Sequence, residues 1–197
     1  MTRVVLLMKD FELAKTRLSS VLDPAARRII ALDFALAALD AVGSGALVVA
    51  GSETAAGVAR SLGNEVLVEQ RAGGQNPAAR LGIAAAVERG ADAVLLLSSD
   101  LPLISAGVVA RLLDWADGLP RPAVVAAPAI GRGGTNALYL APPRAIELHF
   151  GDDSLAKFES DARSRGVRFE TYESPELALD IDEPSDLAAF RERRRAG

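Results

Sequence analysis

Acidic side chains in this chain follow a segment with the pattern of a buried strand. Residues 93–97 form an unbroken apolar run, typical of a strand covered on both faces, and Asp100 comes shortly after it. Ligands of open α/β sheets bind beyond the carboxyl ends of the strands, so we expect Asp100 to project into such a crevice. Pro102 prevents the strand from continuing, and a carboxylate fixed there suits Mg²⁺. The alternative is that Asp100 caps the next helix, although Ser105 is better placed for that role.

A second pair of acids lies near the end of the chain. Asp180 and Asp182 are two residues apart in an extended segment, so their side chains are expected to point to one face. Two carboxylates on one face repel each other unless a cation lies between them, which makes the pair a candidate metal site together with Asp100. The competing interpretation is that Asp182 or Glu183 caps the helix expected to begin at Pro184.

Three cations follow the first expected strand, residues 3–8. Lys9, Lys15 and Arg17 occupy the loop where a dinucleotide-binding protein would carry a Gly-x-Gly-x-x-Gly turn, and the sequence has no such turn there. An arginine and two lysines at a strand end can neutralise a polyphosphate, the arginine with bidentate geometry and the lysines as compact charges. An ordinary solvated loop is the alternative, and the position at the edge of the first strand favours the phosphate role.

Other polar groups follow later strands. Asn76 either caps the helix expected over residues 78–88 or hydrogen-bonds a nucleotide. The loop 131–134 carries three glycines before Thr135, which leaves backbone N–H groups free to surround an anion, although a plain hairpin turn would explain the same glycines. Ser154 lies at the amino terminus of an expected helix, where a phosphate is favourable.

Composition narrows the classes of protein. The 197 residues predict a single domain, 1–197, large enough to bury a core. A formal net charge of −4 argues against binding to nucleic acid, and the absence of Cys together with a single His excludes zinc thiolate and multi-histidine sites. No apolar run approaches membrane-spanning length and the amino terminus lacks the pattern of a signal peptide, so we expect a soluble, cytoplasmic protein.

Expected strands and helices alternate along the first half of the chain. Strands are expected over 3–8, 46–50 and 65–69, with helices between them that begin after the capping residues Asp23 and Ser52. Strict alternation predicts right-handed crossovers and a largely parallel sheet between two layers of helices.

Six short motifs, in register over nearly the whole chain, make the sequence similar to one family. They are Lys9 with residues 14–19, Gln75-Asn76 with Arg80, residues 100–103, residues 134–138, Phe150-Gly151 with Ser154, and residues 179–182. Together they resemble the 2-phospho-L-lactate and phosphoenolpyruvate guanylyltransferases of coenzyme F420 biosynthesis. The resemblance implies a three-layer α/β/α nucleotidyltransferase (Rossmann-like) fold with a mostly parallel mixed sheet. It also implies Mg²⁺ dependence and transfer of GMP from GTP to the phosphate of a three-carbon acid.

The resemblance further assigns roles to individual residues. Those implied to bind GTP are Lys9, Lys15, Arg17 and Asn76. Those implied to hold Mg²⁺ are Asp100, Asp180 and Asp182. Those implied to hold the phosphate of the acceptor are Thr135, Gly151 and Ser154. Lys15, Arg17 and Asp100 are the residues expected to act in catalysis. The sequence departs from the usual family pattern at Ser98-Ser99, at Pro77 and at Asp152-Asp153.

Two other functions fit parts of the sequence. One is a related nucleotidyltransferase that acts on a sugar phosphate or molybdopterin, although the loop 15–17 replaces the glycine-rich signature usual in those enzymes. The other is a non-catalytic nucleotide-binding protein, which would have little use for three converging acids. The acceptor, which could be phosphoenolpyruvate, 2-phospho-L-lactate or 3-phosphoglycerate, stays open, as does the oligomeric state, with a homodimer as one option.

Overall fold

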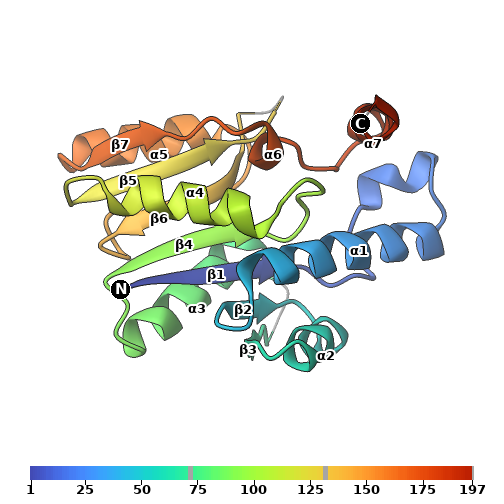
Figure 1. The fold of residues 1–197 in the computed structure, drawn as a ribbon, viewed down its shortest axis with the longest axis horizontal. Coiled ribbons are helices and arrows are strands. Elements are labelled where there is room, and N and C mark those ends of the chain that lie inside the picture. Colours follow the sequence, from blue (N-terminus) through green and yellow to red (C-terminus); the bar gives the residue numbers. More distant parts are fainter. Residues whose placement is uncertain (71–72, 131–132, 197) are drawn as a thin grey trace.

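A seven-stranded sheet lies between two layers of helices (Figure 1). This computed structural model describes residues 1–70, 73–130 and 133–196, with the backbone alone at residues 191 and 193–196. The strands are β1 (Thr2–Met8), β2 (Leu47–Ala50), β3 (Glu65–Val68), β4 (Ala93–Ser98), β5 (Ala123–Pro128), β6 (Thr135–Ala141) and β7 (Arg168–Thr171). The helices are η1 (Thr16–Ser20), α1 (Pro24–Val42), α2 (Glu53–Ser61), α3 (Gln75–Glu88), α4 (Ala106–Asp117), α5 (Ser154–Ser164), α6 (Pro175–Ala178) and α7 (Pro184–Ala196).

The strand order explains why distant segments meet at one edge. The order is β3-β2-β1-β4-β6-β5-β7, and all neighbours are parallel except β6, which runs antiparallel to both β4 and β5. The prediction of a mostly parallel mixed sheet is confirmed. Because β6 is reversed, it begins at the edge where β1, β4 and β5 end. Thr135, its first residue, therefore lies at the same edge as Asp100.

Alternate residues of the central strands face two different layers. In β4, Leu95 and Leu97 pack in the core under α1 and α4, whereas Val94 and Leu96 pack in the core under α3 and α5. Every residue of β4 is buried, as its unbroken apolar sequence predicted, and full burial of each large apolar side chain contributes about 1.5–3 kcal/mol. Close approach of α3 to the sheet requires Gly82, where an added Cβ would lie 2.3 Å from Val5 Cγ1.

The helix caps predicted at Asp23, Ser52 and Ser105 are present. Asp23 accepts the backbone N–H of Ala26 at 2.8 Å, and Ser52 caps α2 in the same way. Ser105 caps α4, as predicted, and the Asp100 side chain is thereby left for another role. None of the helices in the described residues is long and apolar enough to cross a membrane.

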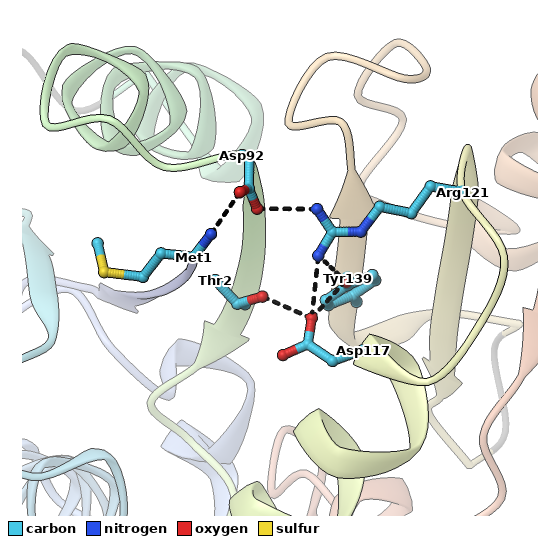
Figure 2. A network of polar contacts seen from close by, with 6 residues as sticks. All are labelled: Met1, Thr2, Asp92, Asp117, Arg121 and Tyr139. Carbon is cyan, nitrogen blue, oxygen red and sulfur yellow. Dashed lines mark hydrogen bonds and ion pairs between the residues drawn. The ribbon is translucent and has the colours of Figure 1, made fainter.

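A polar network joins β1, β4 and β6 at the opposite edge of the sheet (Figure 2). The Tyr139 hydroxyl, on a fully buried side chain, donates to Asp117 Oδ1 at 2.6 Å and accepts from Arg121 at 3.3 Å. Arg121 also contacts Asp92, whose pKa is lowered to about 2 by the Met1 ammonium and then by Arg121. The network therefore holds the starts of β1 and β4 beside the end of α4.

Tyr139→Phe should lower the free energy of unfolding by about 1–2 kcal/mol, because Asp117 loses a buried donor. Pyrophosphate release, proposed below, should not change, because the network lies at the far edge of the sheet. Urea unfolding at pH 7 measures the first effect. Tyr172→Phe is the matched control, since the Tyr172 ring is partly buried against Trp115. Equal stability of both variants would contradict the prediction.

Candidate active site

Two adjoining pockets lie where β1 and β4 end. The apolar pocket encloses about 160 Å³ and has Leu7, Leu13, Val49 and Ala78 among its lining residues. The polar pocket encloses about 180 Å³, and its lining side chains and loops come from six segments of the chain. Its lining residues include Arg17, Asp100, Thr135, Gly151, Asp152, Asp180 and Asp182. Lys9, Gln75 and Ser98 line both pockets, so one elongated ligand with an apolar end and a charged end can span them.

Asp100, at the end of β4, accepts two side-chain hydrogen bonds and forms an ion pair with a second lysine. Its Oδ1 accepts from Ser98 Oγ at 2.5 Å, and its Oδ2 accepts from Lys15 Nζ at 3.0 Å. Lys9 Nζ lies 3.6 Å from the same Oδ2. Burial opposes ionisation of Asp100, but the positive charges of Lys15 and then Lys9 outweigh it and hold the pKa of this carboxyl well below its usual range. The carboxylate is therefore ionised at neutral pH.

Lys15 is buried between two carboxylates. Its side chain is 3% exposed, and besides Asp100 its Nζ lies 3.5 Å from Asp182 Oδ1. The Phe34 ring packs beneath it, with its centroid 6.0 Å from Nζ. The backbone of Lys15 is left-handed, with φ 57°, and η1 begins at the next residue, in a segment for which the sequence predicted only a loop. In this structure the ammonium group thus contacts the site's acids and not open solvent.

Lys9 and Arg17 are the more accessible cations. Their side chains are 60% and 56% exposed, and both line the polar pocket. Arg17 Nη1 lies 4.0 Å from Asp182 Oδ2. The charge of Asp100, with smaller contributions from Asp182 and Asp180, raises the pKa of Lys9, although partial loss of hydration at its ammonium group opposes this. Lys9 and Arg17 therefore present positive charge to anything that enters the pocket.

The segment that carries Asp180 and Asp182 is attached to β6. Asn136 is buried and its Nδ2 donates to the Leu177 carbonyl at 2.8 Å. At the other side of this segment, Asp186 Oδ2 accepts the backbone N–H groups of Asp182 and Glu183. Sequence reasoning gave Asn136 no role. The signal available in the sequence was a polar amide directly after Thr135, at the start of an apolar segment.

The three acids predicted to hold a metal line one pocket but are not gathered around one point. Among the described residues, no group of three acidic or histidine side chains is close enough to hold an ion, and Lys15 Nζ lies between Asp100 and Asp182. Burial, followed by the negative charges of Asp100 and Asp182, raises the pKa of Asp180 to about 6. The pocket therefore carries negative charge that a cation would relieve, and its oxygen donors are of the type that Mg²⁺ prefers.

Asp180→Asn is expected to stabilise the fold at pH 8 by about 1–3 kcal/mol, measured by urea unfolding in EDTA. In the wild type, the unfolded chain releases the Asp180 proton near pH 3.8 and the folded chain near pH 6. Stability from this group therefore falls as pH rises through this window. The gain in the variant should disappear at pH 4, and an equal gain at both pH values would contradict the assignment. Asp114→Asn, at an exposed position on α4, is the control.

Thr135 and Gly151 line the polar pocket as predicted, whereas Ser154 does not. Ser154 is fully buried, and its Oγ donates to Thr135 Oγ1 at 3.0 Å. The expectation that Ser154 contacts a phosphate directly is not what this structure shows: Ser154 positions the Thr135 hydroxyl. Asp152, one of the two acids that depart from the family pattern, lines the pocket.

Of the two roles that the sequence left open for Asn76, capping α3 is not what the structure shows. The helix begins three residues before the expected range of 78–88, at Gln75, and its N-cap is Gly74, whose φ of 86° an L side chain rarely adopts. The Asn76 amide contacts the backbone of Phe150 in both directions: Nδ2 donates to the carbonyl at 3.0 Å, and Oδ1 accepts the N–H at 2.8 Å. Asn76 thus ties the loop of Gly151 to α3, and its neighbour Gln75 lines both pockets.

Two further features of the sequence concern this edge, namely Arg80, which belongs to one of the six motifs, and the glycine loop before Thr135. Arg80 is exposed and lines neither pocket. The glycine loop before Thr135 is described only in part, because residues 131–132 lie outside the described residues. Gly133 has a φ of 61°, and Gly134 lines the polar pocket.

Comparison with known proteins shows the family of this chain. The sequence model described as guanylyl transferase CofC like matches residues 2–190. The chain belongs to this family. A phosphoenolpyruvate guanylyltransferase of Rubrobacter xylanophilus is 40% identical over 185 residues, which are 92% of this chain and 89% of that protein. A 2-phospho-L-lactate guanylyltransferase of Methanothermobacter thermautotrophicus is 36% identical over 193 residues, which are 94% of this chain and 82% of that protein.

Solved structures support the predicted fold class. A nucleotidyl transferase of Methanothermobacter has a TM-score of 0.70 against this chain at 19% identity, and the match covers 100% of this chain and 99% of that one. At this identity the likeness concerns the fold alone. With the family match, it confirms the prediction of an α/β nucleotidyltransferase.

Proposed function

We propose that this protein transfers GMP from GTP to the phosphate of a three-carbon phospho-acid and releases pyrophosphate, as a step of coenzyme F420 biosynthesis. The observation that carries the proposal is the continuous pair of pockets, with Lys9 between them and with Arg17 and Asp100 in the polar one. Membership of the guanylyl transferase family favours this reaction over transfer to a sugar phosphate or molybdopterin.

The two pockets fit the two parts of a nucleotide. The apolar pocket suits a flat base, because its lining is mostly aliphatic and cavities of about 150 Å³ accept an aromatic ring. Lys9 lies at the junction, so a base bound there would direct its phosphates toward Lys9 and Arg17 in the polar pocket. These two cations are positioned to neutralise the pyrophosphate as it leaves.

The reaction needs little covalent help from the protein. An oxygen of the acceptor phosphate forms a bond to the α-phosphorus of GTP, and the bond from that phosphorus to the oxygen that bridges the α- and β-phosphates breaks in line, so this oxygen leaves with the pyrophosphate. The nucleophile is already anionic, so no general base is required, and positioning with charge neutralisation supplies most of the rate. This suits a chain with no Cys and with one His, His149, which contacts Asp161 of α5.

Mg²⁺ is the metal that we propose for this site. Asp100, Asp180 and Asp182 would hold it, since all three line the polar pocket and offer only oxygen atoms. When bound, it would offset the repulsion between the acceptor and the triphosphate. The phosphate of the acceptor is proposed to lie against Thr135 and Gly151, which line the same pocket.

The first experiment offers GTP and Mg²⁺ to the purified full chain with phosphoenolpyruvate, 2-phospho-L-lactate or 3-phosphoglycerate, and measures pyrophosphate. Release that requires one of these acceptors, and stops in excess EDTA, is the expected result. Release with glucose 1-phosphate alone would favour a sugar-phosphate transferase. Folded protein that binds GTP without releasing pyrophosphate in any mixture would overturn the proposal and favour a nucleotide-binding protein.

A further inference from the structure

The apolar pocket has a carboxylate at its rim that the chemistry above does not use. Glu69 follows β3 directly, lines the pocket and is half-buried. Its backbone N–H donates to the Ala50 carbonyl at 2.9 Å, which continues the pairing of β3 with β2 and fixes where the side chain starts. The other acid in this lining is Asp10, whose Oδ1 already accepts the Glu12 N–H at 3.0 Å.

The Glu69 carboxylate lies close to Gly51, which also lines the pocket. An added Cβ at Gly51, another lining residue, would lie 2.8 Å from the Asp10 nitrogen and 3.5 Å from Glu69 Oε2. Glycine at this position therefore allows the carboxylate and the Asp10 backbone to close over the end of β2. Burial raises the pKa of Glu69, and a backbone hydrogen bond from Gly73 opposes that shift only in part. Further N–H donors would thus stabilise the ionised carboxylate.

We propose that Glu69 is the residue that selects guanine, by accepting hydrogen bonds from N1–H and the 2-amino group of the base. This inference rests on the proposed function, because it requires a nucleotide whose phosphates extend toward Lys9 and whose base lies in the apolar pocket. With the phosphates anchored by Lys9, a base edge that reaches Glu69 in the same lining faces a carboxylate.

The chemistry of a carboxylate distinguishes the purines. An ionised carboxylate only accepts hydrogen bonds, and its two oxygens match two parallel donors. Guanine presents N1–H and the 2-amino group side by side, which are two donors. Hypoxanthine lacks the amino group and offers one. Adenine presents one donor and a lone pair at N1, so a carboxylate facing that edge would meet an acceptor, which a buried site rejects strongly.

The test compares GTP, ITP and ATP as substrates for the wild type and for Glu69→Gln, each with the acceptor found active. In the wild type we expect kcat/KM to fall from GTP to ITP to ATP. A glutamine amide offers one acceptor and one donor, which match adenine, so Glu69→Gln should reduce the GTP-to-ATP preference by about 10- to 100-fold. Glu88→Gln, an equal charge change at an exposed position of the same helix that contributes Gln75, should keep the wild-type preference.

Binding measurements separate this inference from the proposed function. Calorimetric titration of GMP and AMP needs no turnover, so a preference for GMP that Glu69→Gln removes would support the inference even if no pyrophosphate were released. Equal kcat/KM for GTP and ITP in the wild type would overturn it without any variant. An unchanged GTP-to-ATP ratio in a folded Glu69→Gln protein would also overturn it, while leaving the guanylyl transfer itself established.

Discussion

Asp100→Asn is expected to lower the rate of pyrophosphate release by about 10²–10³-fold, while the chain still folds. The ionised carboxylate fixes Lys9 and Lys15 through one oxygen and lies at the end of the central strand, facing the polar pocket. An amide of the same shape would remove the negative charge that orients both cations and that we propose as a metal ligand. The fold should persist because Lys15 keeps a second carboxylate partner in Asp182.

The measurement is kcat at saturating GTP and acceptor, with circular dichroism and thermal unfolding to verify folding. Asp114→Asn serves again as the control, because it makes the same chemical change on the exposed side of α4. Turnover of Asp100→Asn within threefold of the control would remove Asp100 from the reaction machinery. Loss of turnover together with loss of folded structure would instead make Asp100 a structural residue.

The elements of this fold could be predicted because their signals are local. The buried run of β4 and the caps at Asp23 and Ser105 depend on residues a few positions apart, and all are present in the structure. The position of β6 between β4 and β5 could not be predicted, since strand order depends on pairing between segments far apart in the chain. Because β6 is reversed, Thr135 lies at the edge of the sheet where β4 ends and where Asp100 follows it.

The candidate site was predicted in its residue types more than in its contacts. The sequence predicted that Lys15 contacts a phosphate and that Asp182 contacts a metal ion, and it predicted no contact between the two side chains. In the structure the two residues contact each other, because unlike charges that converge on one pocket pair when nothing else lies between them. Ser154 and Asn76 differ for a related reason: each satisfies its polar group on a neighbour that only the tertiary fold supplies. Glu69 carries no motif, and only the pocket reveals it.

Lys15→Met is expected to affect turnover and stability together, whereas Lys9→Met should affect turnover alone. Both ammonium groups lie near Asp100 Oδ2, at 3.0 Å for Lys15 and 3.6 Å for Lys9, but the Lys15 side chain is 3% exposed and that of Lys9 is 60% exposed. Removing the cation of a buried pair costs about 3–5 kcal/mol, and Lys15→Met leaves Asp100 and Asp182 with only the more exposed cations Lys9 and Arg17 near them. An exposed pair contributes about 0–1 kcal/mol, so Lys9→Met should unfold at nearly the wild-type urea concentration.

The pH dependence of the Lys15 effect identifies its cause. The positive charge of Lys15, with that of Lys9, holds the pKa of Asp100 well below the unfolded value of 3.8, so the stability from this pair is complete above that pH and declines below it. The difference in unfolding free energy between the wild type and Lys15→Met should therefore be largest at pH 5–8 and shrink toward pH 3. A difference that does not vary with pH would indicate lost packing against Phe34 as the cause. Lys15→Arg should retain much of the stability, because the positive charge between the two carboxylates is kept. It should not retain the turnover, because a planar guanidinium does not place its charge where a compact ammonium does.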